Sequence, residues 1–152
     1  MPLSNPTPRA EAQPVDLIEW TQGAALIATG SPFAPVFWQK EQFDIAQCNN
    51  AYIFPGLGLG VLASKARRIT EGMLMTASRT LAAHSPLVKT EKGGLLPPVD
   101  NIEAVSRSIA LAVARTAVEE GIAPALTDAA LEKRIEQMYW KANYASYRRA
   151  SL

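Results

Sequence analysis

The sequence predicts an α/β fold in which a short buried strand is followed mainly by helices. The run AALIATG at 24–30 is apolar and bounded by glycines, which is typical of a buried strand. The segment 51–66 has the length of a helix, and 102–121 carries apolar residues at helical spacing. With 152 residues, the chain is long enough for one domain with its own core.

Local signals place the elements in the first third of the chain. Thr7 before Pro8 predicts a helix N-cap with proline at the first helical position. Pro14 is expected to open a second helix, which stops at Gly23. The loosely alternating segment 34–48 then predicts an excursion or a hairpin at the edge of the sheet.

Capping residues predict where the later helices begin. Asp100 and Glu103 form a D-x-x-E arrangement related to the capping box, and Gly121 is expected to end the helix that they start. The preceding segment 85–99 contains glycines and prolines and is expected to be a loop. The expected caps are Asn49 or Asn50 for 51–66, Thr70 for 71–84, Asp100 for 102–121 and Thr127 for the last helix.

The glycines of QCNNAYIFPGLGLG at 47–60 suggest a dinucleotide site at first sight. A dinucleotide fingerprint needs G-x-G-x-x-G between a strand and a helix, so that backbone N–H groups reach a pyrophosphate. Gly56, Gly58 and Gly60 give G-x-G-x-G instead. We therefore interpret them as packing residues that let another backbone approach the helix.

Composition excludes several classes of function. A net charge of +1 provides no field that would attract nucleic acid. The single cysteine, Cys48, forms no internal disulfide and has no zinc-site spacing around it. No signal peptide or membrane span is evident, so a cytoplasmic protein is expected.

Few residue types here support independent catalysis. The only histidine, His84, lies near the end of a predicted helix, where capping is a stronger interpretation than catalysis. Cys48 has no local base, and the acidic residues form no trio suited to a divalent ion. The tail aromatics have roughly helical spacing and either cover the domain or meet a partner chain; they are Tyr139, Trp140, Tyr144 and Tyr147.

Asparagines are the more informative polar residues. Asn5 follows a short apolar stub, and Asn49 and Asn50 precede a predicted helix. Ligand contacts of α/β proteins lie outside the carboxyl ends of strands. An amide offers a hydrogen-bond donor and an acceptor and does not titrate, which suits contact with a ligand. The alternative is that these asparagines only form turns or cap helices.

Three strings together resemble the C-terminal part of malic enzyme, the oxidative decarboxylase of malate: LSNPT, ALIATGSPF and QCNNAYIFPGLGLGV. The later pieces ITEGMLMTASRTLA and LLPPVDNIEAVSRSIALAVA, with Trp140 and Tyr144, resemble the same family in the same order. The resemblance covers essentially the whole chain and is strongest to the bacterial NAD-linked type. It implies the second half of the sheet of a Rossmann-like NAD-binding domain at 1–121, followed by a C-terminal helical tail at 122–152.

The resemblance also implies roles for the polar residues. Asn5, Asn49 and Asn50 would contact malate or its product pyruvate, while NAD would lie against Asn5 and Asn49. NADP stays an alternative. The turn of Thr29, Gly30 and Ser31 would line the cofactor cleft. Members of the family are commonly homo-oligomers.

Other parts of the family pattern are absent from this sequence. They are the acid and base, the ligands of Mg or Mn, the arginine that binds malate and the dinucleotide fingerprint. The chain is therefore expected to be a truncated, split or frameshifted product with little or no activity alone, rescued by an N-terminal half. The alternatives are a non-catalytic interaction module that joins malic enzyme subunits and, more remotely, a small independent dehydrogenase.

Overall fold

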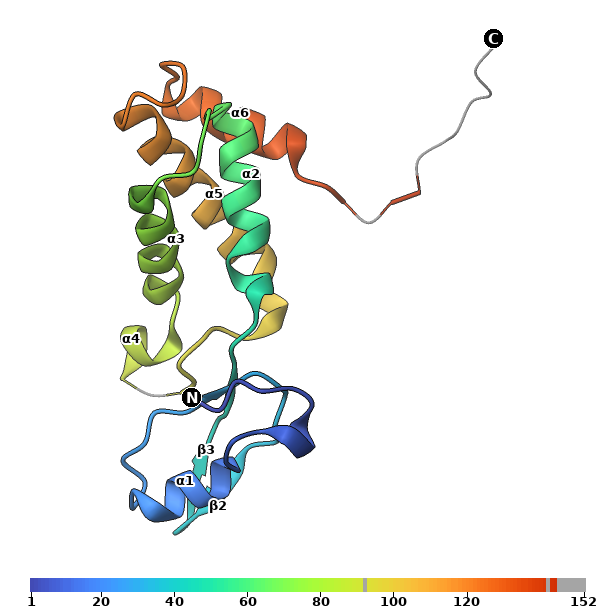
Figure 1. The fold of residues 1–152 in the computed structure, drawn as a ribbon, viewed down its shortest axis with the longest axis vertical. Coiled ribbons are helices and arrows are strands. Elements are labelled where there is room, and N and C mark those ends of the chain that lie inside the picture. The colour runs from blue at the N-terminus through green and yellow to red at the C-terminus, as the bar shows by residue number, and fades with distance from the viewer. Residues whose placement is uncertain (92, 142, 145–152) are drawn as a thin grey trace.

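The chain forms an elongated molecule with two lobes, shown in Figure 1. The computed structural model describes residues 1–91, 93–141 and 143–144. We call residues 1–49 the strand lobe and residues 50–141 the helical lobe. Among the described residues, no helix is long and apolar enough to cross a membrane.

The strand lobe contains two small sheets. Strands β1 and β4 are parallel, with Ala28 opposite Ala46 and Thr29 opposite Gln47. Strands β2 and β3 form an antiparallel hairpin within 34–48, as predicted, but the hairpin is a two-stranded sheet of its own and not the edge of the β1–β4 sheet. The elements of this lobe are a 3₁₀ turn (Thr7–Arg9), helix α1 (Pro14–Trp20) and strands β1 (Ala28–Thr29), β2 (Val36–Trp38), β3 (Glu41–Phe43) and β4 (Ala46–Gln47).

A third stretch of backbone lies against β1. The Gly30 N–H donates to the Pro2 carbonyl at 3.0 Å. A Cβ atom at Gly30 would lie 2.1 Å from the carbonyl oxygen of Leu3, so only glycine fits this approach. Strand β1 thus lies between the first residues and β4.

The helical lobe is built from longer elements. Thr70 caps α3 by accepting from the Met73 N–H, and Thr127 caps α6 by accepting from the Ala130 N–H, as predicted. Gly121 has φ +68° just after α5, which confirms the predicted stop. The elements are a 3₁₀ turn (Asn50–Tyr52), α2 (Phe54–Ser64), α3 (Glu71–Ala83), α4 (Pro86–Thr90), a 3₁₀ turn (Val99–Asn101), α5 (Ile102–Glu119) and α6 (Asp128–Met138).

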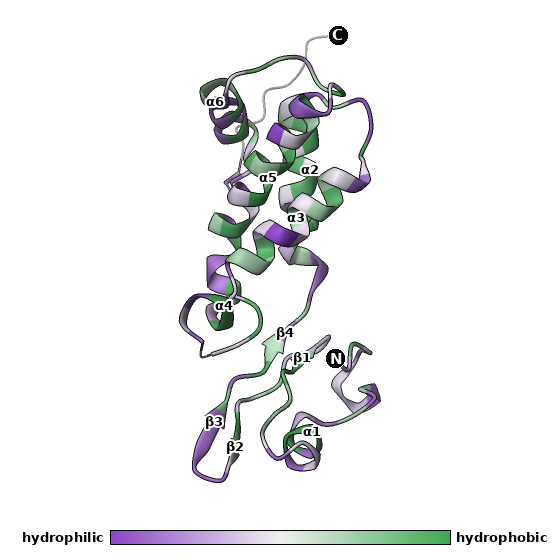
Figure 2. Cartoon of the chain, turned by 90° about the vertical axis from the view of Figure 1, so that its left-hand side faces the viewer, coloured by the Kyte–Doolittle hydropathy of each residue, from purple (hydrophilic) through white to green (hydrophobic). Residues whose placement is uncertain are grey.

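The main core lies where α2, α3 and α5 meet, and Figure 2 shows hydrophobic residues gathered there. Glycine makes the contact between α2 and α5 close. A Cβ at Gly56 would lie 2.7 Å from the Ser106 carbonyl oxygen, and one at Gly60 would lie 2.6 Å from that of Ala110. The core residues are Leu57, Met73, Ala77, Val105, Ile109, Val113, Ala117 and Ile122.

Several local predictions were wrong. Thr7 is the first residue of its 3₁₀ turn, whose N-cap is Pro6. The expected loop 85–99 contains α4, since Pro86 at the start of that helix needs no backbone donor there. The Asp100 capping box does not form, because the chain makes a 3₁₀ turn into α5 and Asn101 becomes the N-cap without a side-chain bond.

Candidate functional site

The predicted polar residues gather at one edge of the strand lobe. Strands β1 and β4 are parallel, so their carboxyl ends lie at the same edge. Ser31 follows β1 by two residues and Asn49 follows β4 by two residues. Asn5 follows the stretch that bonds to Gly30. Residues 4–5, 29–31 and 47–50 form what we call the strand-end site.

A chain of hydrogen bonds joins the first two of these segments. The Ser31 hydroxyl donates to Oδ1 of Asn5, and the Thr29 hydroxyl donates to the Ser31 carbonyl at 2.8 Å. Thr29 is fully buried and Ser31 is 5% exposed, whereas Asn5 lies at the surface. Because Asn5 accepts through its oxygen, its amide nitrogen is the group left to donate outward.

The β4 side adds a second asparagine. The Cys48 N–H donates to the Thr29 carbonyl at 2.7 Å, and the Gln47 side chain donates to the Gly30 carbonyl at 3.3 Å. Asn49 is exposed, and its Oδ1 accepts from the Ala51 N–H at 2.9 Å, which makes it the cap of the turn before α2. Of the two candidate caps, Asn49 therefore caps the turn, but the expectation that it caps the helix was wrong, because α2 begins at Phe54 with Ile53 as its N-cap and no side-chain cap bond.

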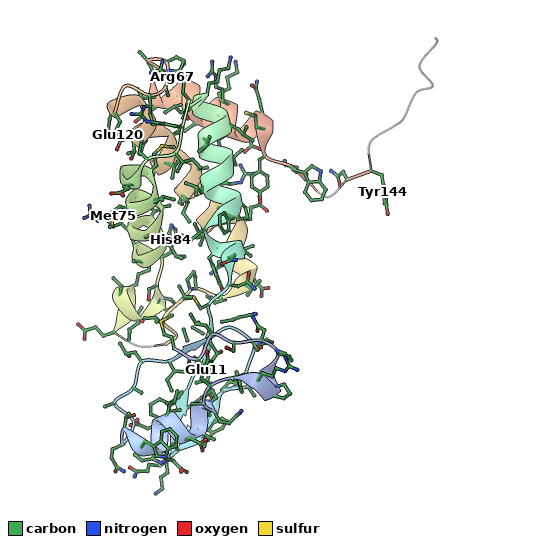
Figure 3. The ribbon with its side chains drawn as sticks, in the orientation of Figure 1. Glu11, Arg67, Met75, His84, Glu120 and Tyr144 are labelled. Atoms are coloured by element: carbon green, nitrogen blue, oxygen red, sulfur yellow. The ribbon has the colours of Figure 1, made fainter. Side chains whose placement is uncertain are left out.

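Glu11 fixes the backbone next to Asn5. Its carboxylate accepts from the Ser4 N–H at 3.2 Å and from the Ser4 hydroxyl at 2.8 Å. A hydrogen bond from its own backbone, together with these bonds from Ser4, holds the pKa of Glu11 below its ordinary value. Figure 3 shows Glu11 within the strand lobe. The sequence alone assigned no role to Glu11.

The strand-end site carries amides and hydroxyls rather than a phosphate cradle. Gly56, Gly58 and Gly60 lie inside α2, whose backbone N–H groups are largely used by the helix. Their interpretation as packing residues is confirmed at Gly56 and Gly60. Exposed amides fit hydrogen bonding to a carboxylate or to the carboxamide of a nicotinamide. Over the described ranges, no group of three His, Cys, Asp or Glu residues could hold a metal ion, so this surface alone does not fit one.

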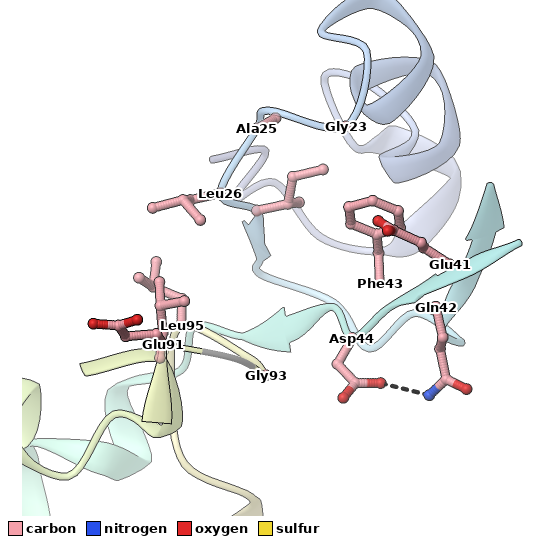
Figure 4. Close-up of a pocket in the computed structure, with 12 residues that line it drawn as sticks. Gly23, Ala25, Leu26, Glu41, Gln42, Phe43, Asp44, Glu91, Gly93 and Leu95 are labelled. Carbon is pink, nitrogen blue, oxygen red and sulfur yellow. Dashed lines mark hydrogen bonds between the residues drawn. The ribbon is translucent and has the colours of Figure 1, made fainter. Parts of the chain in front are cut away.

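An open pocket of about 510 Å³ lies at the opposite end of the parallel strands. Its walls come from the segment before β1, the hairpin and the region of α4 (Figure 4). Asp44 accepts there from the Gln42 amide at 2.8 Å, while Glu91 and Leu26 lie at the surface. None of the predicted site residues lines this pocket.

The other candidates from the sequence lie elsewhere. His84 is the C-cap of α3, as its capping interpretation expected. On α3, Met73 is buried in the core, whereas Met75 is 52% exposed and points outward in Figure 3. α6 ends at Met138, and the tail is not helical over 139–141 and 143–144. Tyr147 lies outside the described residues.

Comparison with known proteins decides the family. The family model described as "Malic enzyme, NAD binding domain" matches residues 1–118. The chain belongs to the malic enzyme family. NAD-dependent malic enzymes of Salmonella arizonae and Salmonella heidelberg are 57% identical to it over 152 residues, which is 100% of this chain and 27% of each relative.

Solved malic enzymes share its fold. The enzyme of Entamoeba histolytica matches with a TM-score of 0.65 at 28% identity, over 86% of this chain and 25% of that one. The enzyme of Pyrococcus horikoshii matches with a TM-score of 0.65 at 29% identity, over 90% and 28%. The chain is therefore a malic enzyme fragment that contains part of a Rossmann-like NAD-binding domain, and it spans 27% of the length of the curated relatives.

Proposed function

We propose that this chain is the C-terminal part of an NAD-dependent malic enzyme and that its strand-end site supplies amide contacts to malate and NAD. The observation that carries the proposal is that Ser31, which follows β1, bonds to Asn5, while Asn49 follows the parallel neighbour β4 at the same edge. Ligands of open α/β sheets bind at this place. The strand-end site of this chain would thus form one wall of the cleft.

The residues of this chain would position the substrate and the cofactor. They would not transfer protons. Asn5 is held by Ser31 through its oxygen, so its nitrogen would donate to a carboxylate or to an amide oxygen. Asn49 and Asn50 would act similarly from the β4 side. Bound NAD would supply the hydride acceptor. The acid, the base and the ligands of Mg or Mn would come from the part of the enzyme that this chain lacks.

The test is malate-dependent reduction of NAD in the presence of manganese. The chain would be assayed alone and after co-expression with the portion of Salmonella arizonae malic enzyme outside the match. We expect no activity from the chain alone and activity from the combination. Activity of the chain alone would contradict the proposal, and inactivity of an assembled combination would contradict it as well.

Asparagine variants sharpen this test. Asn49→Ser keeps an oxygen that can cap the turn but removes the amide. We expect a loss of about tenfold or more in kcat/KM for Asn49→Ser and for Asn5→Ala, since a hydrogen bond to a charged group contributes about 1.5–3 kcal/mol. Asn101→Ala is the matched control, because Asn101 is exposed and makes no side-chain cap bond.

A second candidate is a non-catalytic module that associates with malic enzyme subunits. The exposed aromatic residues after α6 favour it, since Trp140 is 77% exposed. A module would bind intact enzyme without restoring activity to an incomplete one. The same co-expression assay therefore separates the two functions.

A further inference from the structure

Asn5 is held at the strand-end site through its side chain and through the backbone before it. The Ser31 hydroxyl bonds to the side-chain oxygen of Asn5. The Gly30 N–H donates to the Pro2 carbonyl at 3.0 Å, which ties the start of the chain to β1. These two attachments leave Ser4, the residue directly before Asn5, to be held by another group.

Glu11 holds Ser4 through both of its hydrogen-bond donors. The Ser4 N–H donates to one oxygen of the Glu11 carboxylate at 3.2 Å, and the Ser4 hydroxyl donates to the other at 2.8 Å. Two bonds to one carboxylate fix the orientation of Ser4 better than a single bond would. Residues 4 and 11 therefore close a small loop, and Asn5 lies inside it.

The rest of that loop keeps its shape without Glu11. The 3₁₀ turn Thr7–Arg9 is closed by backbone hydrogen bonds of its own, and these bonds do not include Ser4 or Asn5. The Glu11 carboxylate follows the turn and reaches back to Ser4. It thus connects a self-contained turn to the segment that carries Asn5.

The charge of Glu11 argues for a geometric role. Malate and NAD, the proposed ligands of the strand-end site, are both anions. A side chain that attracted them would be positively charged, whereas Glu11 is negative and engages Ser4 with both oxygens. The contribution of Glu11 to the site is therefore the position of its neighbours.

We propose that Glu11 is a positioning residue that orients the Asn5 amide through Ser4. It keeps the backbone of Asn5 where the side-chain oxygen meets Ser31, so the amide nitrogen is directed outward before a ligand arrives. The ligand then pays no further cost to order this loop. The inference rests on the proposed function, because it explains how one of the proposed ligand-binding residues is oriented.

The experiment measures malate-dependent NAD reduction by the chain co-expressed with the portion of Salmonella arizonae malic enzyme outside the match. Glu11→Ala should lower kcat/KM by about two- to tenfold, chiefly through a higher KM, since the loosened side chain must be ordered on binding. Glu11→Gln keeps a carbonyl oxygen that can accept from Ser4 and should lose less. A rise of kcat/KM in both variants would assign Glu11 a repulsive charge effect and overturn the inference.

A double variant separates positioning from a general structural role. In the Asn5→Ala background, Glu11→Ala should cause no further loss of kcat/KM, because the group that it positions is gone. A loss that persists in full in this background would overturn the inference. Glu19→Ala is the matched control, because it removes an exposed carboxylate of the same lobe on α1 and should leave kcat/KM unchanged.

Hydrogen exchange of the same complex gives a readout that needs no activity. The segment that contains Ser4 should exchange faster in Glu11→Ala, since the Ser4 N–H loses its acceptor, and should be unaffected in Glu19→Ala. An inactive combination with this faster exchange would contradict the proposed function and support the ordering role of Glu11. Unaltered kcat/KM in Glu11→Ala, or unaltered exchange, would overturn the inference and leave the proposed function standing.

Discussion

The two lobes of this chain differ in how they are held together. Among the described residues, both apolar core clusters lie in the helical lobe, where α2, α3, α5 and α6 pack on each other. The strand lobe is joined by backbone hydrogen bonds between stretches of two or three residues. The helical lobe therefore has the means to fold by itself, whereas the strand lobe depends on neighbours that extend its sheet.

The largest expected effect comes from removing a core side chain of the helical lobe. Ile109 is fully buried between α2, α3 and α5. Ile109→Ala should lower the free energy of unfolding by about 2–5 kcal/mol, measured by urea denaturation. Ile69→Ala is the control, because Ile69 is 51% exposed and its loss should stay within about 0.5 kcal/mol. Equal effects at both positions would mean that the helical core is not packed as described.

The next effect distinguishes two glycines of α2. Gly60→Ala would place a Cβ 2.6 Å from the Ala110 carbonyl oxygen and should cost about 1–3 kcal/mol through overpacking. Gly58→Ala meets no atom and should stabilise the chain by up to about 1 kcal/mol, since alanine favours the helix. Thermal unfolding of the two variants measures the difference. A stabilising Gly60→Ala would contradict the close contact of α2 with α5.

A local effect is expected in the strand lobe. Gly30→Ala would drive a Cβ into the Leu3 carbonyl and separate the first residues from β1. The Cys48 amide, which bonds to Thr29, should then exchange its hydrogen faster, whereas the amide of Val113 in α5 should be unaffected. Equal acceleration at both amides would show that the lobes unfold as one unit.

The smallest effect concerns an exposed pair that fastens α6 to α5. The hydrogen bond and the charge of Arg107 hold the pKa of Glu136 below its ordinary value of 4.5. The stabilisation is therefore complete above pH 4.5 and is lost as the pH falls through the lower folded value. The protection factors of α6 amides, which correct exchange for its intrinsic pH dependence, should fall in that range and should lose this dependence in Glu136→Gln. High salt should shrink the dependence, because the pair is exposed.

The sequence signals were reliable where a side chain acts on its own neighbours. Thr70 and Thr127 bond to amides three residues away, so their caps could be predicted from local pattern alone. The same local reasoning missed α4, because the proline and glycines around it also suit a loop. Its error at Asp100 arose because Asn101, not Asp100, became the N-cap of α5.

Contacts between distant segments could not be predicted in this way. The bond between Ser31 and Asn5 joins residues 26 apart, and the cation–π contact of Arg107 with Tyr139 depends on how α6 lies on α5. The position of Asn5 and Asn49 near strand ends was expected from the sequence and from the family resemblance, whereas their contacts with a ligand stay a prediction. The pocket beside Glu41 and Asp44 gave no sequence signal, since its walls come from three separate segments.

The single cysteine offers a practical consequence of the β1–β4 pairing. Cys48 is half-buried at the end of β4, next to Asn49, and its amide bonds to Thr29. A thiol-reactive dye would therefore attach at one chemically unique position beside the strand-end site. Its labelling rate and fluorescence would report how often that edge of the sheet opens and whether it closes when the missing part of the enzyme is added.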